Sequence, residues 1–193
     1  MAWQVDYAHS HLQFSVKHMM ITWVRGQFSK FKVEGDFNEK QPERSTLEVK
    51  IDAASIDTKI EPRDAHLRSA DFLDAEQYPY IVFKGKRGDV LDGQRGRLIG
   101  DLTIKGVTRE VALDVEHTGV AKTPWGTLAA GFTAQTRINR KDWGLNWNKA
   151  LETGGWLVGD EIKIDIEIEF TKVPEQQATP ERVAPASNVS VAA

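Results

Sequence analysis

Three polar side chains that could take part in chemistry lie close together near residue 65. Arg63, His66 and Asp71 combine a guanidinium, an imidazole and a carboxylate within one short stretch. Together they could form the reactive cluster of an enzyme. Arg63 and His66 could instead hold an anionic or polar head group through charge-assisted hydrogen bonds. The stretch therefore has two functional interpretations, one catalytic and one binding.

The same stretch departs from the pattern of the rest of the chain, because apolar and polar residues stop alternating over residues 63–74. Pro62 suits the first position of a helix, where its missing N–H is not needed. Asp64 and Arg68 are four residues apart and could pair along a helix surface. We therefore expect one short helix here, which caps or plugs the structure formed by the strands.

A second segment rich in aromatic and charged residues, 139–148, lies between the two longest expected strands. It contains Arg140, Trp143 and Trp147. Loops at the open end of a barrel often carry function, so Arg140 could join the cluster near residue 65 in binding a head group. In the alternative interpretation, the two tryptophans plug the barrel end and Arg140 pairs with a carboxylate.

The other combinations of reactive side chains are weak signals. His9 and His11 would point to the same face of a strand, but a lone His-x-His pair with no third ligand nearby is poor support for zinc. Ser10 lacks the glycine-flanked elbow of a serine hydrolase. Phosphate-binding and dinucleotide-binding glycine motifs are also missing from the sequence. We therefore expect no catalytic residue, no metal ligand and no cofactor.

Regular alternation of apolar and polar residues dominates the sequence and predicts strands. The pattern is clearest near the C-terminus, where Ile162, Ile164, Ile166 and Ile168 oppose charged neighbours. Eight strands are expected, at residues 11–17, 28–37, 46–52, 80–83, 98–104, 110–116, 127–138 and 162–170.

Strands that are polar on one face argue against a parallel sheet that is covered on both sides. Short connections, such as the turn at Asp92-Gly93, favour antiparallel neighbours. We prefer an antiparallel barrel because closure removes the exposed edges of long strands, and a two-sheet sandwich is the alternative. Strands of about eleven or twelve residues, tilted by about 40°, would make a barrel roughly 30 Å tall. Large and small residues alternate on the expected inner face, so a packed interior and a hollow one both fit.

Composition limits the possible partners and the domain organisation. The formal net charge is −3 with mixed signs along the 193 residues, which gives no support for nucleic acid as a partner. The sequence has no apolar run long enough to span a bilayer, no recognisable secretion signal and no cysteine, so we expect a cytoplasmic protein. Residues 173–193 are rich in proline, alanine, serine and glutamine and predict a disordered tail.

The ordered landmarks of the chain resemble the YceI-like family of polyisoprenoid-binding, lipocalin-like proteins. The resemblance covers about residues 3–172. It rests on Asp6-x-x-His9-Ser10, Phe14-x-Val16-x-His18-Met19, Gly26-x-Phe28, Ser55-Ile56-Asp57-Thr58, Arg63-Asp64-x-His66-Leu67-Arg68-Ser69-x-Asp71-Phe72, Tyr78-Pro79-x-Ile81-x-Phe83, Gly100-Asp101-Leu102-Thr103-Ile104-Lys105-Gly106-Val107-Thr108, Ile138-Asn139-Arg140-x-Asp142-Trp143-Gly144-Leu145 and Val158-Gly159-Asp160-Glu161.

This resemblance implies an all-β fold, an extended eight-stranded antiparallel lipocalin-like barrel with one short helical insertion, over residues 1–172. It also implies a long-chain amphiphile, such as an isoprenoid, a quinone or a fatty-acid-like lipid, in an apolar cavity, and a possible homodimer. Carried over by position, the residues that contact or frame this ligand are Phe14, Val16, His18, Arg63, His66, Phe72, Arg140 and Trp143. To these we add Phe31, Leu102 and Phe132 from the inner faces of the expected strands.

Three functions therefore remain open from the sequence. The first is a non-catalytic protein that sequesters or carries the amphiphile. The second is an enzyme that modifies such a lipid. The third is a ligand-free stress-response barrel with a packed interior. A continuous apolar cavity favours the first, and a filled interior favours the third.

Overall fold

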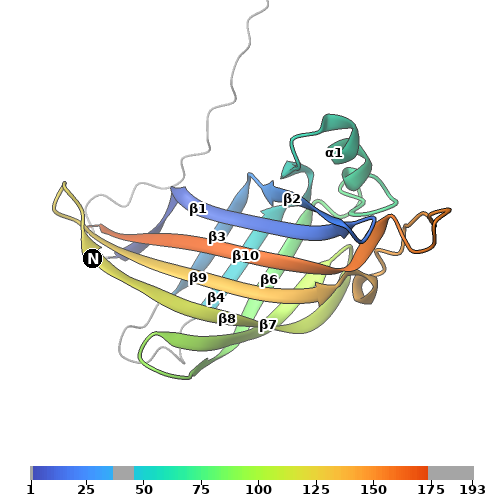
Figure 1. Ribbon diagram of the computed structural model, residues 1–193. Helices are drawn as coiled ribbons and strands as arrows, with labels where there is room; N and C mark the ends of the chain where they lie inside the picture. The colour runs from blue at the N-terminus through green and yellow to red at the C-terminus, as the bar shows by residue number, and fades with distance from the viewer. Residues whose placement is uncertain (1, 37–45, 174–193) are drawn as a thin grey trace, which may run out of the picture.

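The computed structural model describes residues 2–36 and 46–173, which form one curled antiparallel sheet with a short helix at one end (Figure 1). In chain order the elements are β1 (Ala2–His18), β2 (Thr22–Phe28), β3 (Phe31–Asp36), β4 (Thr46–Asp52), the 3-10 helix η2 (Ala53–Ser55), β5 (Ile56–Asp57), α1 (Glu61–Arg68), β6 (Tyr80–Val90), β7 (Arg95–Ile104), β8 (Val107–Lys122), β9 (Leu128–Asn139), the 3-10 helix η3 (Arg140–Trp143) and β10 (Val158–Val173).

The sheet has the order β3-β4-β6-β7-β8-β9-β10-β1-β2-β5, so β3 and β5 lie at its two ends. The chain runs directly from β2 into β3, and from β4 through η2 into β5. Two hydrogen bonds join the β2–β3 connection to the β4–β5 connection. The Ser29 N–H donates to the Ser55 carbonyl (3.2 Å), and the Asp52 N–H donates to the Lys30 carbonyl (3.0 Å). The two ends of the sheet are therefore joined. The ten strands become eight when β2 and β3 are counted as one strand and β4 and β5 as another.

The prediction of an antiparallel, lipocalin-like barrel with one helical insertion is confirmed, although β2 and β5 were not predicted. Strand β2 was missed because Gly26 occupies an inward position and interrupts the alternation. A Cβ atom at Gly26 would lie 2.5 Å from the Phe14 ring, so the close approach of β1 and β2 leaves no room for a side chain. Strand β5 is only two residues long. Phe37, which the expected second strand included, lies outside the described residues.

One end of the barrel is closed by α1, the turns that follow it, η3 and the loop before β10 (Figure 1); we call it the closed end. Buried apolar side chains concentrate there. Those of Ala53, Ile56, Leu73, Ile104 and Leu145 belong to a single hydrophobic cluster. The opposite end, which carries the β6–β7 and β8–β9 hairpin turns, is the open end. The predicted capping role of the helix is therefore confirmed.

The helix is shorter than the predicted range 63–74, because it ends at Arg68 and turns follow. Pro62 lies in its first turn, as predicted. The expected pair between Asp64 and Arg68 is wrong. Asp64 is buried and accepts hydrogen bonds from Thr58, whereas Arg68 pairs with Glu61.

Two further predictions meet the structure only in part. The predicted disordered tail at 173–193 lies, apart from the last residue of β10, outside the described residues. Among the residues that are described, none of the helices has the length and apolar character needed to cross a membrane.

Candidate functional site

A cavity of about 2630 Å³ runs along the inside of the curled sheet. The inward side chains of β10 and β9, including Ile164, Ile166, Phe170 and Phe132, form one wall. The cavity extends from Leu67 and Leu73 at the closed end to Gln94 and Arg95 at the open end. The interior is therefore hollow. The packed interior, which the sequence also allowed, is not found in the described part of the chain.

The structure divides the predicted ligand-binding residues into two groups. Seven line the cavity: Phe14, Val16, Phe31, Phe72, Leu102, Phe132 and Arg140. Four are not among the lining residues: His18, Arg63, His66 and Trp143. The first group is mainly apolar and inward-facing. The second contains polar and aromatic side chains, and those of Arg63, His66 and Trp143 contact other parts of the protein at or near the closed end.

Arg140 and Trp143 hold the loop before β10 against the barrel. The Arg140 side chain is 1% exposed and donates to the carbonyls of Gly159 (2.9 Å), Trp147 (2.9 Å) and Leu145. Burial lowers the pKa of the Arg140 guanidinium, and the carboxylate of Asp160, 3.3 Å away, opposes this shift. The alternative interpretation from the sequence, in which Arg140 pairs with a carboxylate, is confirmed.

Trp143 plugs the barrel end, as the alternative interpretation of the sequence also predicted. Its side chain is 3% exposed, and its Nε1–H donates to the Leu102 carbonyl at 3.0 Å. Trp143 therefore fixes η3 to strand β7. Trp147 lies nearby, where its ring contacts the rings of His66 and Phe72 edge-on and tilted, respectively.

The cluster around residue 65 is tied to its own neighbours. Arg63 donates to the hydroxyl (2.7 Å) and the carbonyl (2.8 Å) of Thr58, and so fixes the start of α1. The His66 Nε2 lies 2.7 Å from a carboxylate oxygen of Asp71. Arg63 and His66 thus have protein partners, and their predicted contact with a head group stays a prediction.

His9 has a carboxylate partner rather than the second histidine considered from the sequence. A bulge in β1 between Asp6 and His11 places the His9 Nδ1 3.0 Å from Asp6, with Glu169 on the neighbouring strand. The hydrogen bond that the His9 ring donates to the Asp6 carboxylate, with the negative charges of Asp6 and Glu169, raises the pKa of His9. Among the described residues, His11 is not part of this group.

The open end carries exposed ion pairs. Its arginines have acidic neighbours: Arg87 with Asp89 (3.2 Å), Arg95 with Asp92 (2.7 Å) and Arg97 with Asp114 (3.2 Å). Hydrogen bonds from the N–H groups of Gln94 and Arg95, and from the Arg95 side chain, lower the pKa of Asp92 to about 2.

His117 is one of the cavity residues that the sequence reasoning did not name. His117 follows Leu113 and Val115 on the inner face of β8 and lines the cavity. The alternation of residues 111–117 contained the signal, but the expected strand ended at 116. The imidazole ring contacts the ring of Phe132 with centroids 5.0 Å apart.

Comparison with known proteins identifies the family. The YceI-like domain matches residues 3–170. A UPF0312 protein of Staphylococcus aureus (strain N315) is 41% identical over 169 residues, which are 86% of this chain and 95% of that protein.

Solved structures have the same fold. A Campylobacter jejuni YceI protein is 33% identical, with a TM-score of 0.70, over 82% of this chain and 90% of that one. Burkholderia cenocepacia BcnA is 23% identical with a TM-score of 0.75, over 86% of this chain and 99% of that one. A polyisoprenoid-binding domain from Saccharophagus degradans is 15% identical with a TM-score of 0.59, over 88% and 98%. With a domain match over residues 3–170 and these relatives, the chain belongs to the YceI-like family.

Proposed function

We propose that the protein binds a long-chain amphiphile, such as an isoprenoid, a quinone or a fatty-acid-like lipid, and sequesters or carries it. The main support for this proposal is the cavity of about 2630 Å³, which is lined mainly by apolar side chains. This volume exceeds the several hundred Å³ typical of sites for compact small molecules. Burial of an extended chain in it would contribute about 25 cal/mol for each Å² of apolar surface.

The position of the reactive-looking residues supports binding over catalysis. His66 and Asp71 pair with each other, and neither is among the cavity-lining residues. Arg63 is engaged with Thr58. An enzyme would need a reactive group held against its substrate, and this cluster does not face the cavity. A YceI-fold domain from another organism is named as polyisoprenoid-binding, which agrees with the proposed ligand class.

The test is to block the cavity without changing the outer surface. Ala134 faces the cavity in β9, and Gln135 follows it on the outer face. Ala134→Trp fills space that the lipid would occupy, whereas Gln135→Trp adds the same ring outside. Native mass spectrometry and organic extraction of both variants and the unchanged protein measure the bound lipid, and circular dichroism checks the fold.

We expect a lipid adduct near one per chain for the unchanged protein and for Gln135→Trp, and a loss of at least tenfold for folded Ala134→Trp. Equal lipid content in all three proteins would contradict binding in the cavity. Absence of any adduct, together with no uptake of added long-chain lipid, would contradict the function itself. The cytoplasmic location and the homodimer stay predictions.

A further inference from the structure

His117 lies where the cavity approaches the open end. Strand β8 pairs with β7 up to Glu116, and the His117 backbone N–H donates to the Gln94 carbonyl at 2.7 Å in the β6–β7 turn. From Val107, at the other end of β8, the strand reaches His117 after roughly 33 Å. The part of the cavity between His117 and the closed end is therefore long enough for an extended chain, and apolar residues such as Val120 and Leu128 also line the cavity beyond His117.

The surroundings of His117 on the cavity wall are apolar. Its cross-strand partner is Phe132, whose ring also contacts Phe170 with centroids 5.9 Å apart. Val115 precedes it on the same inner face. The imidazole therefore has no polar partner among these neighbours on the wall.

Two other polar side chains that line the cavity are engaged within the protein. The Thr136 hydroxyl donates to the Ala112 carbonyl (2.8 Å), and the Ser10 hydroxyl donates to the Asp6 carbonyl (2.7 Å). Within residues 2–36 and 46–173, the His117 ring nitrogens have no hydrogen-bond partner. His117 can therefore offer both nitrogens to a ligand, and a neutral imidazole supplies one donor and one acceptor.

The charges at the open end argue against an anionic head group. Arg87, Arg95 and Arg97 each have an aspartate within 3.2 Å. A phosphate or diphosphate would have to compete with these carboxylates for the guanidinium groups. An uncharged oxygen needs no such exchange, because a carbonyl or hydroxyl group hydrogen-bonds directly to an imidazole.

We infer that His117 is the polar anchor of the cavity. It hydrogen-bonds an uncharged carbonyl or hydroxyl group at the end of a long apolar chain, which extends from His117 toward Leu67 and Phe72. This inference rests on the proposed binding function and adds the residue, the orientation and the chemical class of the polar group. Pockets of this kind use a few polar groups to fix the orientation of a mainly apolar ligand.

The experiment compares three probes that share one branched carbon skeleton: phytol, phytyl diphosphate and phytane. Each probe displaces an environment-sensitive apolar fluorophore from the delipidated full-length protein. The variants are His117→Leu, which removes the hydrogen bond, and His117→Gln, which retains donor and acceptor groups. Thermal unfolding of each variant checks that the barrel is intact.

We expect phytol to bind roughly 3- to 10-fold more weakly to His117→Leu, which is the effect of one net hydrogen bond. His117→Gln should restore much of the affinity, and phytane should bind both variants as it binds the unchanged protein. Equal phytol affinity in the unchanged protein and His117→Leu would overturn the anchor but not the carrier function. Tighter binding of phytyl diphosphate than of phytol would overturn the uncharged head group. Failure of all three probes to bind would overturn the inference together with the proposed function.

Discussion

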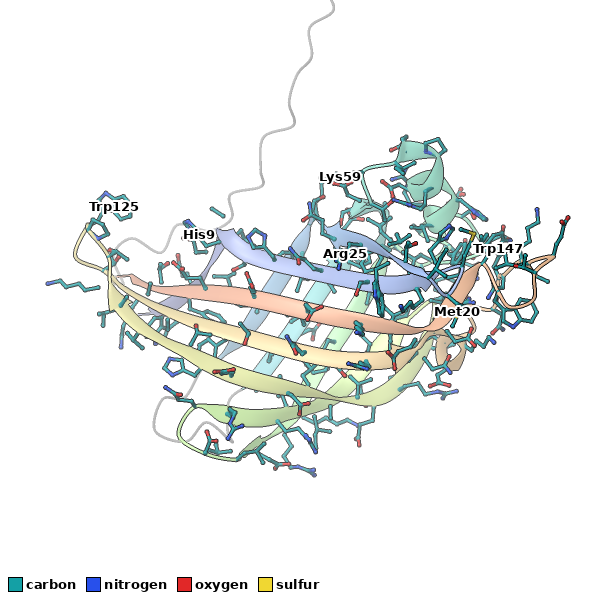
Figure 2. The ribbon with its side chains drawn as sticks, in the orientation of Figure 1. His9, Met20, Arg25, Lys59, Trp125 and Trp147 are labelled. Atoms are coloured by element: carbon teal, nitrogen blue, oxygen red, sulfur yellow. The ribbon has the colours of Figure 1, made fainter. Side chains whose placement is uncertain are left out.

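The two ends of the barrel differ in packing and in how their polar groups are engaged. At the closed end, Trp143 is 3% exposed and Arg140 is 1% exposed, and both donate to backbone carbonyls. At the open end, Trp125 is 86% exposed and Val90 is 73% exposed. Figure 2 shows Trp125 at the tip of the β8–β9 turn, far from Trp147 and Met20 at the other end.

The conspicuous sequence motifs and the proposed polar anchor of the ligand therefore lie toward opposite ends of the barrel. The charged and aromatic residues that most resemble a functional site in the sequence lie at the closed end, where they hold the plug in place. The open end has weaker sequence signals, because its side chains are exposed and its ion pairs lie at the surface. Exposed ion pairs stabilise little, so we expect the open end to contribute less to the free energy of unfolding than the closed end.

The largest expected effect comes from one tryptophan at each end. Trp143→Ala removes a buried aromatic side chain and leaves the Leu102 carbonyl without its donor. We expect it to lower the free energy of unfolding by about 3–5 kcal/mol. Trp125→Ala should change it by no more than about 0.5 kcal/mol, because Trp125 is almost fully exposed. Urea denaturation followed by circular dichroism measures both changes.

Equal losses in the two tryptophan variants would contradict the distinction between the ends. A small loss for Trp143→Ala alone would show that the plug contributes little to global stability and that the loop before β10 unfolds independently.

A matched pair of arginines, Arg137 in β9 and Arg140 at the start of η3, gives the next largest effect. Arg140→Met preserves much of the side-chain volume but leaves the buried carbonyls of Gly159 and Leu145 without their donor. We expect a loss of about 2–4 kcal/mol, since several buried acceptors become unsatisfied. Arg137→Met removes an exposed pair with Glu161 and should cost less than about 1 kcal/mol. A ratio near one between the two losses, measured by the same denaturation, would rule out a structural role for Arg140.

Two glycines compare the packing where β1 meets β2 with the packing near the open end. A Cβ atom at Gly26 would lie 2.5 Å from the Phe14 ring and 2.8 Å from the Thr58 methyl group. We expect Gly26→Ala to lower the free energy of unfolding by about 1–3 kcal/mol. At Gly88, near the open end, no atom lies within 4 Å of the added Cβ. Gly88→Ala should therefore be tolerated, and a loss there as large as at Gly26 would show that the open end is also tightly packed.

The strands could be predicted because alternation reports directly which face is buried, as in Ile162 to Ile168 of β10. Strand β2 could not, because Gly26 removes the inward side chain that would have marked it. The family motifs identified Phe14, Phe72 and Arg140 as cavity neighbours, but a motif does not state the partners of a side chain. Arg63 could bind a head group or Thr58, and only the fold brings Thr58 within 2.7 Å of it. Residue type thus predicts which groups can form hydrogen bonds, and tertiary structure decides where.

The smallest effect is expected at the β6–β7 turn of the open end, where Asp92 accepts hydrogen bonds from the N–H groups of Gln94 (3.0 Å) and Arg95 (2.8 Å). These bonds lower the pKa of Asp92 from 3.8 to about 2. A lowered pKa in the folded state means that the turn is stabilised above pH 3.8, and that this contribution is lost as the pH falls through the folded value. NMR titration should find the lowered pKa, and Asp92→Asn should speed amide exchange at Gln94 and Arg95. The global unfolding midpoint should barely move, because an exposed turn opens locally. A midpoint shift as large as that of Trp143→Ala would mean that the two ends unfold as one cooperative unit.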